Sequence, residues 1–428
     1  MFDGIKYFFK SLGPGLITGA SDDDPSGIAT YSQAGAQFGL GTLWLALFQL
    51  PLMMAIQEMC ARIGLVTGSG LTSIMKKRYS KKAVYPIISL LLVANTINIG
   101  ADIGAMSASV KLVLPQLPIV IVTILFTALV VCAEIFIPYG KYVTILKYLT
   151  LSLLAYVITA FVVGGNWNEI LLSTIIPHVE FTPSFVMLFV AIFGTTISPY
   201  LFFWQTSEEA EEDVAKNKIK EIGEGTPTIQ KKEISLMRKD VAVGMGLSQA
   251  IMWFIIITTA GTLHVHGLTD VSTADEAAQA LEPLVKTFPH AGELSKSIFA
   301  LGIIGTGLLA IPVLAGSSAY ALSEEFGWKE GLSKKFKQAK GFYLIIAAST
   351  IVGLWVNFAD VDPIKALIYA AVINGIIAVP LLVAIMKIGN DTKILGTRTN
   401  SKISNIAGWV TVGIMGLSVI VMFLTWIK

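Results

Sequence analysis

Long apolar runs separated by short polar segments dominate the chain. A transmembrane helix needs about 20 mostly apolar residues, and eleven runs are of this kind. In chain order they are 12–38, 42–66, 84–112, 117–137, 142–163, 183–205, 241–263, 294–322, 342–356, 363–386 and 406–426. The pattern therefore predicts an all-α integral membrane protein with eleven transmembrane helices.

The composition agrees with a membrane protein. Of 428 residues, 54% are hydrophobic and 14% are charged, whereas an ordinary soluble domain has about 25% charged residues. The 31 basic and 29 acidic residues nearly balance, which argues against a nucleic-acid partner. Two cysteines are too few for a disulfide scaffold, and the first ten residues do not read as a cleaved signal peptide. We therefore expect the lipid bilayer to surround the chain.

Lysine and arginine gather in alternate loops. They are frequent after the second, sixth and eighth apolar runs, whereas segments 164–183 and 357–362 contain none. Basic loops tend to remain in the cytoplasm. The distribution predicts a cytoplasmic amino terminus and, because the number of spans is odd, an external carboxyl terminus.

Two connecting segments have features of their own. The charged segment 207–240 is the one plausible linker, and it divides the spans near the middle. On the external side, Thr273 and Glu276 form a capping-box pattern that predicts a short amphipathic helix through about Thr287. We interpret this helix as an external structural lid.

Three acidic residues and a proline interrupt the first apolar run at its midpoint, where positions 21–27 read SDDDPSG. One carboxylate at this depth costs about 2.5–3.5 kcal/mol on insertion scales, so Asp22, Asp23 and Asp24 cannot face lipid. Asp24 and Pro25 also suit an N-cap and first helical position. That reading explains how a helix restarts, but not why it breaks in mid-membrane. We predict two half-helices beside a polar cavity.

The sixth apolar run has a second interruption, GTTISPY at positions 194–200. An ordinary proline kink is the alternative for this segment taken alone. However, the first and sixth runs each open a group of five. Interrupted helices at corresponding positions of two halves are typical of an inverted-repeat secondary transporter with a midplane site. The predicted units are two repeats, 11–163 and 183–386, and an accessory helix, 406–427.

The two breaks together offer oxygen ligands. They contain Asp24, Thr195 and Ser198, and unwinding frees backbone carbonyl groups. A carboxylate with several neutral oxygens suits a hard cation. Neither break contains a soft ligand, so magnesium or manganese fits better than copper or zinc.

These residues resemble the NRAMP family of divalent-metal transporters. The resemblance rests on Gly13-Pro14-Gly15, Asp24-Pro25-Ser26-Gly27 and Ala29-Thr30, with further agreement at 34–39 and 61–68. It covers roughly residues 11–390. It implies a LeuT-like 5+5 inverted repeat with broken first and sixth helices, transport by alternating access, and metal binding by Asp24.

Two expected metal ligands of the family differ in this chain. Gly27 replaces the asparagine of the family's DPGN motif, and Ser198 replaces the methionine of its sixth-helix pattern, while Thr195 keeps the place of a backbone-carbonyl ligand. Without the thioether the preference for manganese, iron and cadmium should fall, and a roomier all-oxygen site suits hydrated magnesium. The resemblance therefore points to the NRAMP-related magnesium transporter branch. The expected metal site is Asp24, Gly27, Thr195 and Ser198, with no cofactor other than the transported ion.

The proton path that the resemblance implies is reduced here. Asn98 and Ala101 align with two acidic residues of the family's third helix, and Tyr200 replaces a sixth-helix histidine. We expect transport without strict proton coupling, although Asp102, one residue further on, could supply an acid. The wider ion path is expected to include Asp22, Asp23, Asn98, Asp102, Tyr200 and Asn374. Interhelical hydrogen bonding is the alternative role for Asn98 and Asp102.

Other functions stay open. A proton-coupled manganese or iron importer would acidify the interior during uptake. A sodium-coupled amino-acid transporter of the same fold would need a glycine-rich break that exposes helix amides to a substrate carboxylate, and this chain has three acids there. A membrane enzyme or metal sensor is a further class, but no HExxH, GxSxG or P-loop pattern occurs. We expect a transporter and not an enzyme.

Overall fold

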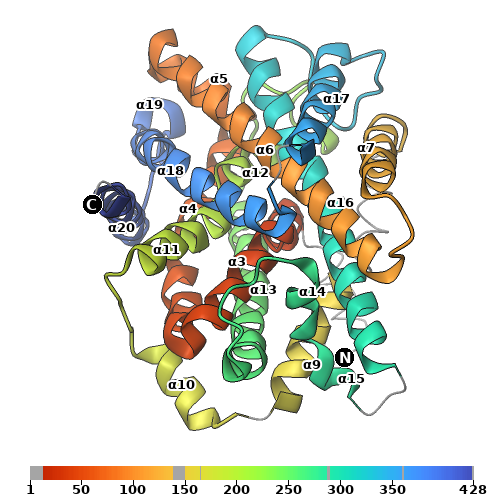
Figure 1. Ribbon diagram of the computed structural model, residues 1–428. Coiled ribbons are helices and arrows are strands. Elements are labelled where there is room, and N and C mark those ends of the chain that lie inside the picture. Colours follow the sequence, from red (N-terminus) through yellow and green to blue (C-terminus); the bar gives the residue numbers. More distant parts are fainter. Residues whose placement is uncertain (1–12, 138–149, 164, 287–289, 359–360, 427–428) are drawn as a thin grey trace, which may run out of the picture.

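The protein is helical throughout the residues that the computed structural model describes, which are 13–137, 150–163, 165–286, 290–358 and 361–426 (Figure 1). Nine helical segments among them are long and apolar enough to cross a membrane. A break divides the first predicted span, which is therefore not among the nine. The fifth predicted span lies partly in 138–149, outside the described residues, and its described end is the apolar helix α9 (Leu154–Val163). The prediction of an all-α membrane protein is confirmed.

Eight of the nine long segments consist mainly of one helix each, and two of these, Lys231–His266 and Lys340–Phe358, end in a 3-10 turn. They are α4 (Trp44–Thr67), α6 (Lys81–Val113), α7 (Ile119–Phe136), α13 (Lys231–Thr262), α16 (Ala291–Phe326), α17 (Lys340–Leu354), α18 (Pro363–Gly389) and α20 (Lys402–Trp426). Short helices connect them at the two ends of the bundle. These are α5 (Leu71–Arg78), α10 (Trp167–Ile175), α14 (Ala274–Gln279), α15 (Glu282–Val285) and α19 (Thr392–Leu395), with 3-10 turns η1 (Gly39–Thr42), η2 (Thr150–Leu153), η3 (His264–His266) and η4 (Trp355–Phe358).

The first span is broken where the sequence predicts it. Helix α2 (Pro14–Asp22) ends at the acidic residues, and α3 (Pro25–Phe38) begins directly after them. Pro25 has no backbone N–H to continue the hydrogen-bond ladder of α2. The Asp24 side chain is the N-cap of α3 and accepts a hydrogen bond from the backbone nitrogen of Gly27 at 2.7 Å. The same residue therefore starts one half-helix and faces the gap before it.

The sixth span is also divided into two half-helices. Helix α11 (Pro183–Thr196) ends before Ile197, and α12 (Pro199–Ala215) begins after Ser198. Ile197 and Ser198 have non-helical backbone angles, with ψ values of 63° and 139°. The segment is thus an unwound break and not a proline kink within a continuous helix.

Helix α13 holds the first broken span in place. It packs along both α2 and α3, which lie near the middle of the bundle, while α11 packs on α3 and α18 (Figure 1). The contact between α2 and α13 is very close at Gly19 and Gly244. A Cβ atom on Gly19 would lie 2.3 Å from the carbonyl of Gly244. The two backbones therefore touch, and this approach requires glycine.

Two connecting segments differ in detail from the sequence prediction. Helix α12 continues to Ala215 and α13 already begins at Lys231, so the predicted linker shortens to 216–230. These extensions are polar, and an apolar run cannot reveal them. The capping box of Thr273 and Glu276 is present, but the helix after it is divided into α14 and α15. Pro283 explains the division, because proline in a helix interior clashes with the carbonyl four residues earlier.

Candidate metal and ion-path site

The carboxylate of Asp24 is the centre of the polar groups at the break of the first span. The residue is 1% exposed. Its Oδ1 atom accepts hydrogen bonds from the Ser26 hydroxyl at 2.6 Å and the Gly27 backbone nitrogen at 2.7 Å, and its Oδ2 accepts one from the Asn98 amide at 3.1 Å. The carboxylate is therefore held by α3 on one side and by α6 on the other.

Thr195 brings the two breaks together. Its Oγ1 atom lies 3.1 Å from the hydroxyl oxygen of Ser26, so α11 and α3 meet where each half-helix ends or begins. A Cβ atom on Gly27 would lie 3.5 Å from Thr195 Oγ1 and 3.1 Å from the carbonyl oxygen of Asp22. Glycine at this position lets the two breaks approach each other closely, and even a methyl group would crowd the Asp22 carbonyl.

Ser198 and Tyr200 face the break from the second half of the sixth span. Ser198 is buried, and its hydroxyl has no hydrogen-bond partner among the described residues. Tyr200 donates its hydroxyl hydrogen to the carbonyl oxygen of Ser21 at 3.1 Å. Ser198 therefore offers a free oxygen, whereas Tyr200 ties α12 to the end of α2.

Asp102 joins this group through Asn98. The Asn98 amide nitrogen lies 3.4 Å from Asp102 Oδ2 and 3.1 Å from Asp24 Oδ2. Asp102 is fully buried, and its Oδ1 atom has no partner among the described residues. One side-chain amide thus bridges the two carboxylates. Asn98 bonds between helices to Asp24, whereas its contact with Asp102 is within α6.

Asp22 and Asp23 point to a different helix from Asp24. The hydroxyl of Ser248 on α13 lies within hydrogen-bond distance of both carboxylates, at 3.2 Å from Asp23. They are 0% and 4% exposed. The sequence predicts that both acids belong to the wider ion path, and this role stays a prediction. The structure buries them because α13 packs directly over the end of α2.

Asn374 is the most isolated residue of the expected ion path. It is 1% exposed, and neither atom of its amide has a hydrogen-bond partner in the part of the chain that the structure describes. Its helix, α18, approaches α11 so closely that a Cβ on Gly194 would lie 2.0 Å from the carbonyl oxygen of Ala371. Asn374 therefore lies on the turn of α18 that packs near the sixth-span break. Its role in the ion path stays a prediction.

The available ligands suit a partly hydrated hard cation. Within the described residues, no group of three His, Cys, Asp or Glu side chains converges to hold a metal ion. The donors at the break are instead the carboxylate of Asp24, hydroxyl groups and free backbone carbonyls. Magnesium usually keeps several waters and takes only one or two protein carboxylates. Such an ion fits a donor set of this kind better than a metal that needs a closed protein cage.

Two polar partners in this region carry no signal in the sequence. Ser248 lies in the middle of an apolar span, and Gln49 on α4 donates from its side-chain amide to Thr196 Oγ1 at 2.8 Å. Polar residues within spans are indications of interhelical contacts, but hydropathy alone does not show which helix they meet. Ser248 and Gln49 connect the two breaks to α13 and α4.

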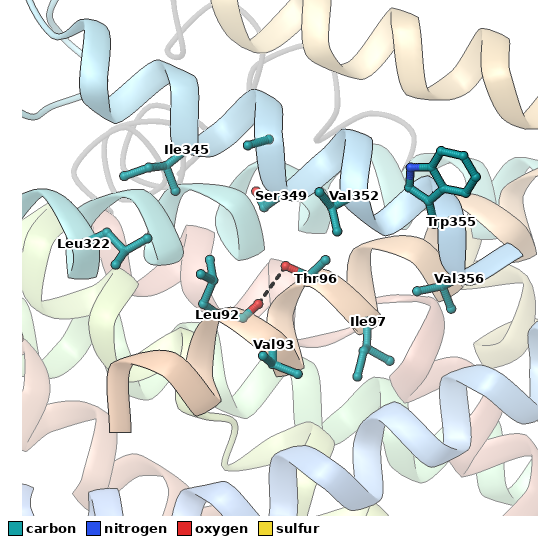
Figure 2. Close-up of a pocket in the computed structure, with 11 residues that line it drawn as sticks. Leu92, Val93, Thr96, Ile97, Leu322, Ile345, Ser349, Val352, Trp355 and Val356 are labelled. Carbon is teal, nitrogen blue, oxygen red and sulfur yellow. Dashed lines mark hydrogen bonds between the residues drawn. The ribbon is translucent and has the colours of Figure 1, made fainter. Parts of the chain in front are cut away.

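An apolar groove lies away from the acidic residues. It has a volume of about 620 Å³ and runs between α6, α16 and α17. Figure 2 shows Leu92, Val93 and Ile97 of α6 opposite Ile345 and Val352 of α17 and Trp355 of η4. The hydroxyl of Thr96 bonds back to the carbonyl of Leu92 at 2.7 Å. No acidic or basic residue lines this groove, so it does not offer ligands for a cation.

Known proteins resemble this chain along nearly all of its length. Two bacterial proteins named divalent metal cation transporter MntH align with it. The one from Pectobacterium carotovorum is 23% identical over 93% of this chain and 90% of its own, and the one from Klebsiella pneumoniae is 25% identical over 94% and 91%.

Solved structures share its fold. A manganese transporter of Eremococcus coleocola superposes with a TM-score of 0.74 at 15% identity, covering 97% of this chain and 86% of that protein. Mhp1, a nucleobase-cation-symport-1 family transporter, superposes with a TM-score of 0.57 at 12% identity, covering 97% and 92%. These likenesses confirm the predicted LeuT-like fold.

The family itself is shown by a whole-chain match. The model of the natural resistance-associated macrophage protein-like family, Nramp, matches residues 15–425, a longer stretch than the motifs alone indicate. This match agrees with the multi-pass architecture and with a transporter rather than an enzyme. The chain therefore belongs to the Nramp family of membrane transporters.

Proposed function

We propose that this protein is a secondary transporter that moves divalent metal cations, magnesium and also manganese, across the membrane by alternating access and without strict proton coupling. The names of the two MntH relatives support a divalent cation as the substrate. Magnesium as the preferred ion and uncoupled transport rest on the residues of this chain.

The observation that carries the proposal is the position of Asp24. Its carboxylate is buried at a helix break, where free backbone carbonyls and the hydroxyls of Ser26 and Thr195 are close. Unwound backbone at membrane depth is tolerated where it is buried in protein or lines a cavity. In an inverted-repeat transporter, such a break is where the substrate ion binds.

The preference for a hard ion is argued from two positions. Gly27 contributes no side-chain ligand, and Ser198 contributes a hydroxyl without a partner among the described residues. Neither position supplies sulfur or nitrogen, which would favour softer metals. A site built of oxygens therefore supports magnesium, with manganese as a second substrate.

A proton-coupled manganese or iron importer is the second candidate. The contact that favours it is the bridge from Asp24 through Asn98 to Asp102, because two acids joined by one amide form a pair that could exchange a proton. A sodium-coupled amino-acid transporter is less favoured. The amides at the start of α3 are already engaged by Asp24, and acidic side chains repel a substrate carboxylate.

Two further features complete the proposal. The repeats are 11–163 and 183–386, with 406–427 as an accessory helix, since the breaks open each group of five spans. The basic loops face the cytoplasm, which places the amino terminus inside and the carboxyl terminus outside.

Flux into proteoliposomes tests this function. Uptake of magnesium, manganese and iron should be compared at a clamped, inside-negative potential, with a pH dye trapped inside. Two charges crossing about 100 mV gain roughly 4.6 kcal/mol, so uptake should follow the potential without internal acidification. Acidification in proportion to uptake, absent from empty liposomes, would support the proton-coupled alternative. Absence of any divalent flux would reject the proposed function.

A further inference from the structure

Four acidic side chains are buried around the first break without a basic partner. Asp22, Asp23, Asp24 and Asp102 are at most 4% exposed. None of them forms an ion pair with a lysine, arginine or histidine that the structure describes. Burial of an uncompensated charge is very costly. One divalent cation at Asp24 balances at most two negative charges, so the other two carboxyl groups need a second cation or protons.

The four carboxyl groups are divided into two separate pairs. Asp24 and Asp102 are joined by Asn98 of α6. Asp22 and Asp23 are joined by Ser248 of α13. The second pair therefore lies against a different helix from the Asp24 carboxylate, although all three acids of the break are consecutive in the sequence.

The Asp22 and Asp23 pair has fewer donors than acceptors. The Ser248 hydroxyl has one hydrogen, so it can donate to only one of the two carboxylates at a time. The Oδ1 atom of Asp22 has no hydrogen-bond partner among the described residues, although Asp22 is fully buried. A buried carboxylate oxygen without a donor is costly. This oxygen is the one that a cation would satisfy.

The surroundings add to the attraction for a cation. Asp22 is the last residue of α2, and the carbonyl end of a helix carries partial negative charge. Two carboxylates, a hydroxyl and helix-end carbonyls are the oxygen ligands that magnesium and manganese take, with water filling the remaining positions. The two carboxylates share one hydroxyl, so a single ion can be bound by both.

We propose that Asp22, Asp23 and Ser248 form a second divalent-cation subsite, separate from Asp24, which an ion occupies as it passes the break. This inference rests on the proposed function, since it concerns the ion that the protein transports. It assigns to α13 a direct part in ion binding. It also gives Asp22 and Asp23 a role that Asp24 alone does not need.

Equilibrium binding to the purified full-length protein tests the subsite. Manganese is the probe, counted by its paramagnetic resonance signal, and magnesium is added as competitor. Asp24→Asn removes the charge of the first site and should still bind one manganese ion. Asp22→Asn with Asp23→Asn should leave binding at Asp24, and the triple variant should bind none. Ser248→Ala in the Asp24→Asn background should weaken the remaining site by roughly 10-fold or more.

Each alternative has its own result. If Asp24→Asn binds no manganese while the Asp22 and Asp23 double variant binds as the wild type does, the second subsite is rejected. The second subsite is also rejected if Asp22 and Asp23 of the Asp24→Asn variant bind protons but no metal. If the wild type itself binds no divalent ion, the proposed function fails instead. If the double variant does not fold, the Ser248→Ala variant in the Asp24→Asn background tests the second subsite, because it removes only one hydroxyl group.

Discussion

The amide nitrogen of Asn98 lies 3.1 Å from Oδ2 of Asp24, which makes α6 a direct support of the acid at the break. Groups that orient a metal ligand commonly change metal affinity by 10–100-fold when they are removed. Asn98→Ala should therefore raise the KM for magnesium or manganese uptake by about 10–100-fold.

Asn95 provides the matched control for that change. It lies one helical turn earlier and donates to the Leu314 carbonyl at 3.0 Å and to Ser317 and Ser318. Asn95→Ala should lower the thermal unfolding midpoint but leave the KM unchanged. If the two variants raise the KM equally, the support of Asp24 by Asn98 is not specific.

Removal of the Asp24 charge should abolish transport without unfolding the protein. Asparagine is as good an N-cap as aspartate, so Asp24→Asn keeps the start of α3 while it removes the anionic ligand. Divalent uptake into proteoliposomes should fall to the level of empty liposomes. Asp275→Asn, a half-exposed acid paired with Lys296, is the control and should transport normally. Normal magnesium flux through Asp24→Asn would remove the basis of the proposed site.

Restoring the family's ligands should change the ion preference. Gly27→Asn and Ser198→Met together restore a side-chain amide at the break and add a soft thioether, so manganese and cadmium should gain over magnesium. The two changes should be non-additive if both side chains bind one ion. Competition for uptake measures the preference.

Ser198→Ala separates the loss of an oxygen from the gain of sulfur. It should weaken uptake of all divalent ions without favouring cadmium. A Cβ on Gly27 is 3.3 Å from the ring of Tyr31, so Ser198→Met alone is the fallback if the double variant folds poorly. An unchanged preference in a folded, active double variant would place selectivity elsewhere.

Asp240 should hold the first half-helix in position. Its carboxylate accepts hydrogen bonds from the backbone nitrogens of Gly15 at 2.7 Å and Leu16 at 3.2 Å. Asp240→Ala should cost about 0.5–2 kcal/mol, as other helix caps do. It should also increase the rate at which a cysteine placed at Ser21 reacts with a maleimide, because α2 separates from α13 more often.

The cap of another helix serves as the control for Asp240. Asp391 caps α19 and accepts from the Lys393 nitrogen at 2.9 Å. Asp391→Ala should lower stability without any change in the labelling rate at position 21. Equal labelling rates at position 21 in the two variants would show that Asp240 has no specific role in holding α2 against α13.

Glu330 should make stability depend on pH. Burial, and then the neighbouring carboxylates of Glu324 and Glu211, raise the pKa of Glu330 well above its usual range, while Lys334 opposes them. A raised pKa in the folded state favours folding below the unfolded pKa, and this contribution is lost as the pH rises through the folded pKa. Glu330→Gln should therefore unfold at the same temperature as the wild type in acid and at a higher temperature in alkaline buffer.

Thermal unfolding between about pH 5 and pH 9 measures this effect. Glu224→Gln, in an exposed part of the linker, should follow the wild type at every pH. A wild-type curve that stays parallel to that of Glu330→Gln over the range would contradict the prediction.

The sequence allowed the two breaks to be predicted because each places proline and polar residues inside an apolar run. Asp24, Gly27 and Thr195 could be brought together because an inverted repeat relates the first and sixth spans. The divergence of Asp22 and Asp23 from Asp24 could not be predicted. Consecutive residues at a helix end point in different directions, and only the packing of α13 determines which helix each one meets.

Other differences have a similar origin. The polar ends of α12 and α13 extend beyond any apolar run, so hydropathy cannot find where these helices end. Ser248 has no distinguishing neighbours in the sequence, and its importance comes from a residue more than 200 positions away. Contacts between distant helices are therefore the part of the site that the sequence leaves open.

The glycine contact between α2 and α13 leaves the first half-helix able to shift along its neighbour. Gly15 and Gly19 meet the backbone of Val241 and Gly244. Because glycine has no side chain, no rotamer at these two positions has to change when α2 shifts against α13. Resistance to such a shift comes from the hydrogen bonds across the contact, which include those of Asp240 to Gly15 and Leu16 and that of Ser248 to Asp22. A methyl group at position 19 would collide with the backbone of Gly244 and block this movement, even though it adds no charge and touches no ligand of the ion.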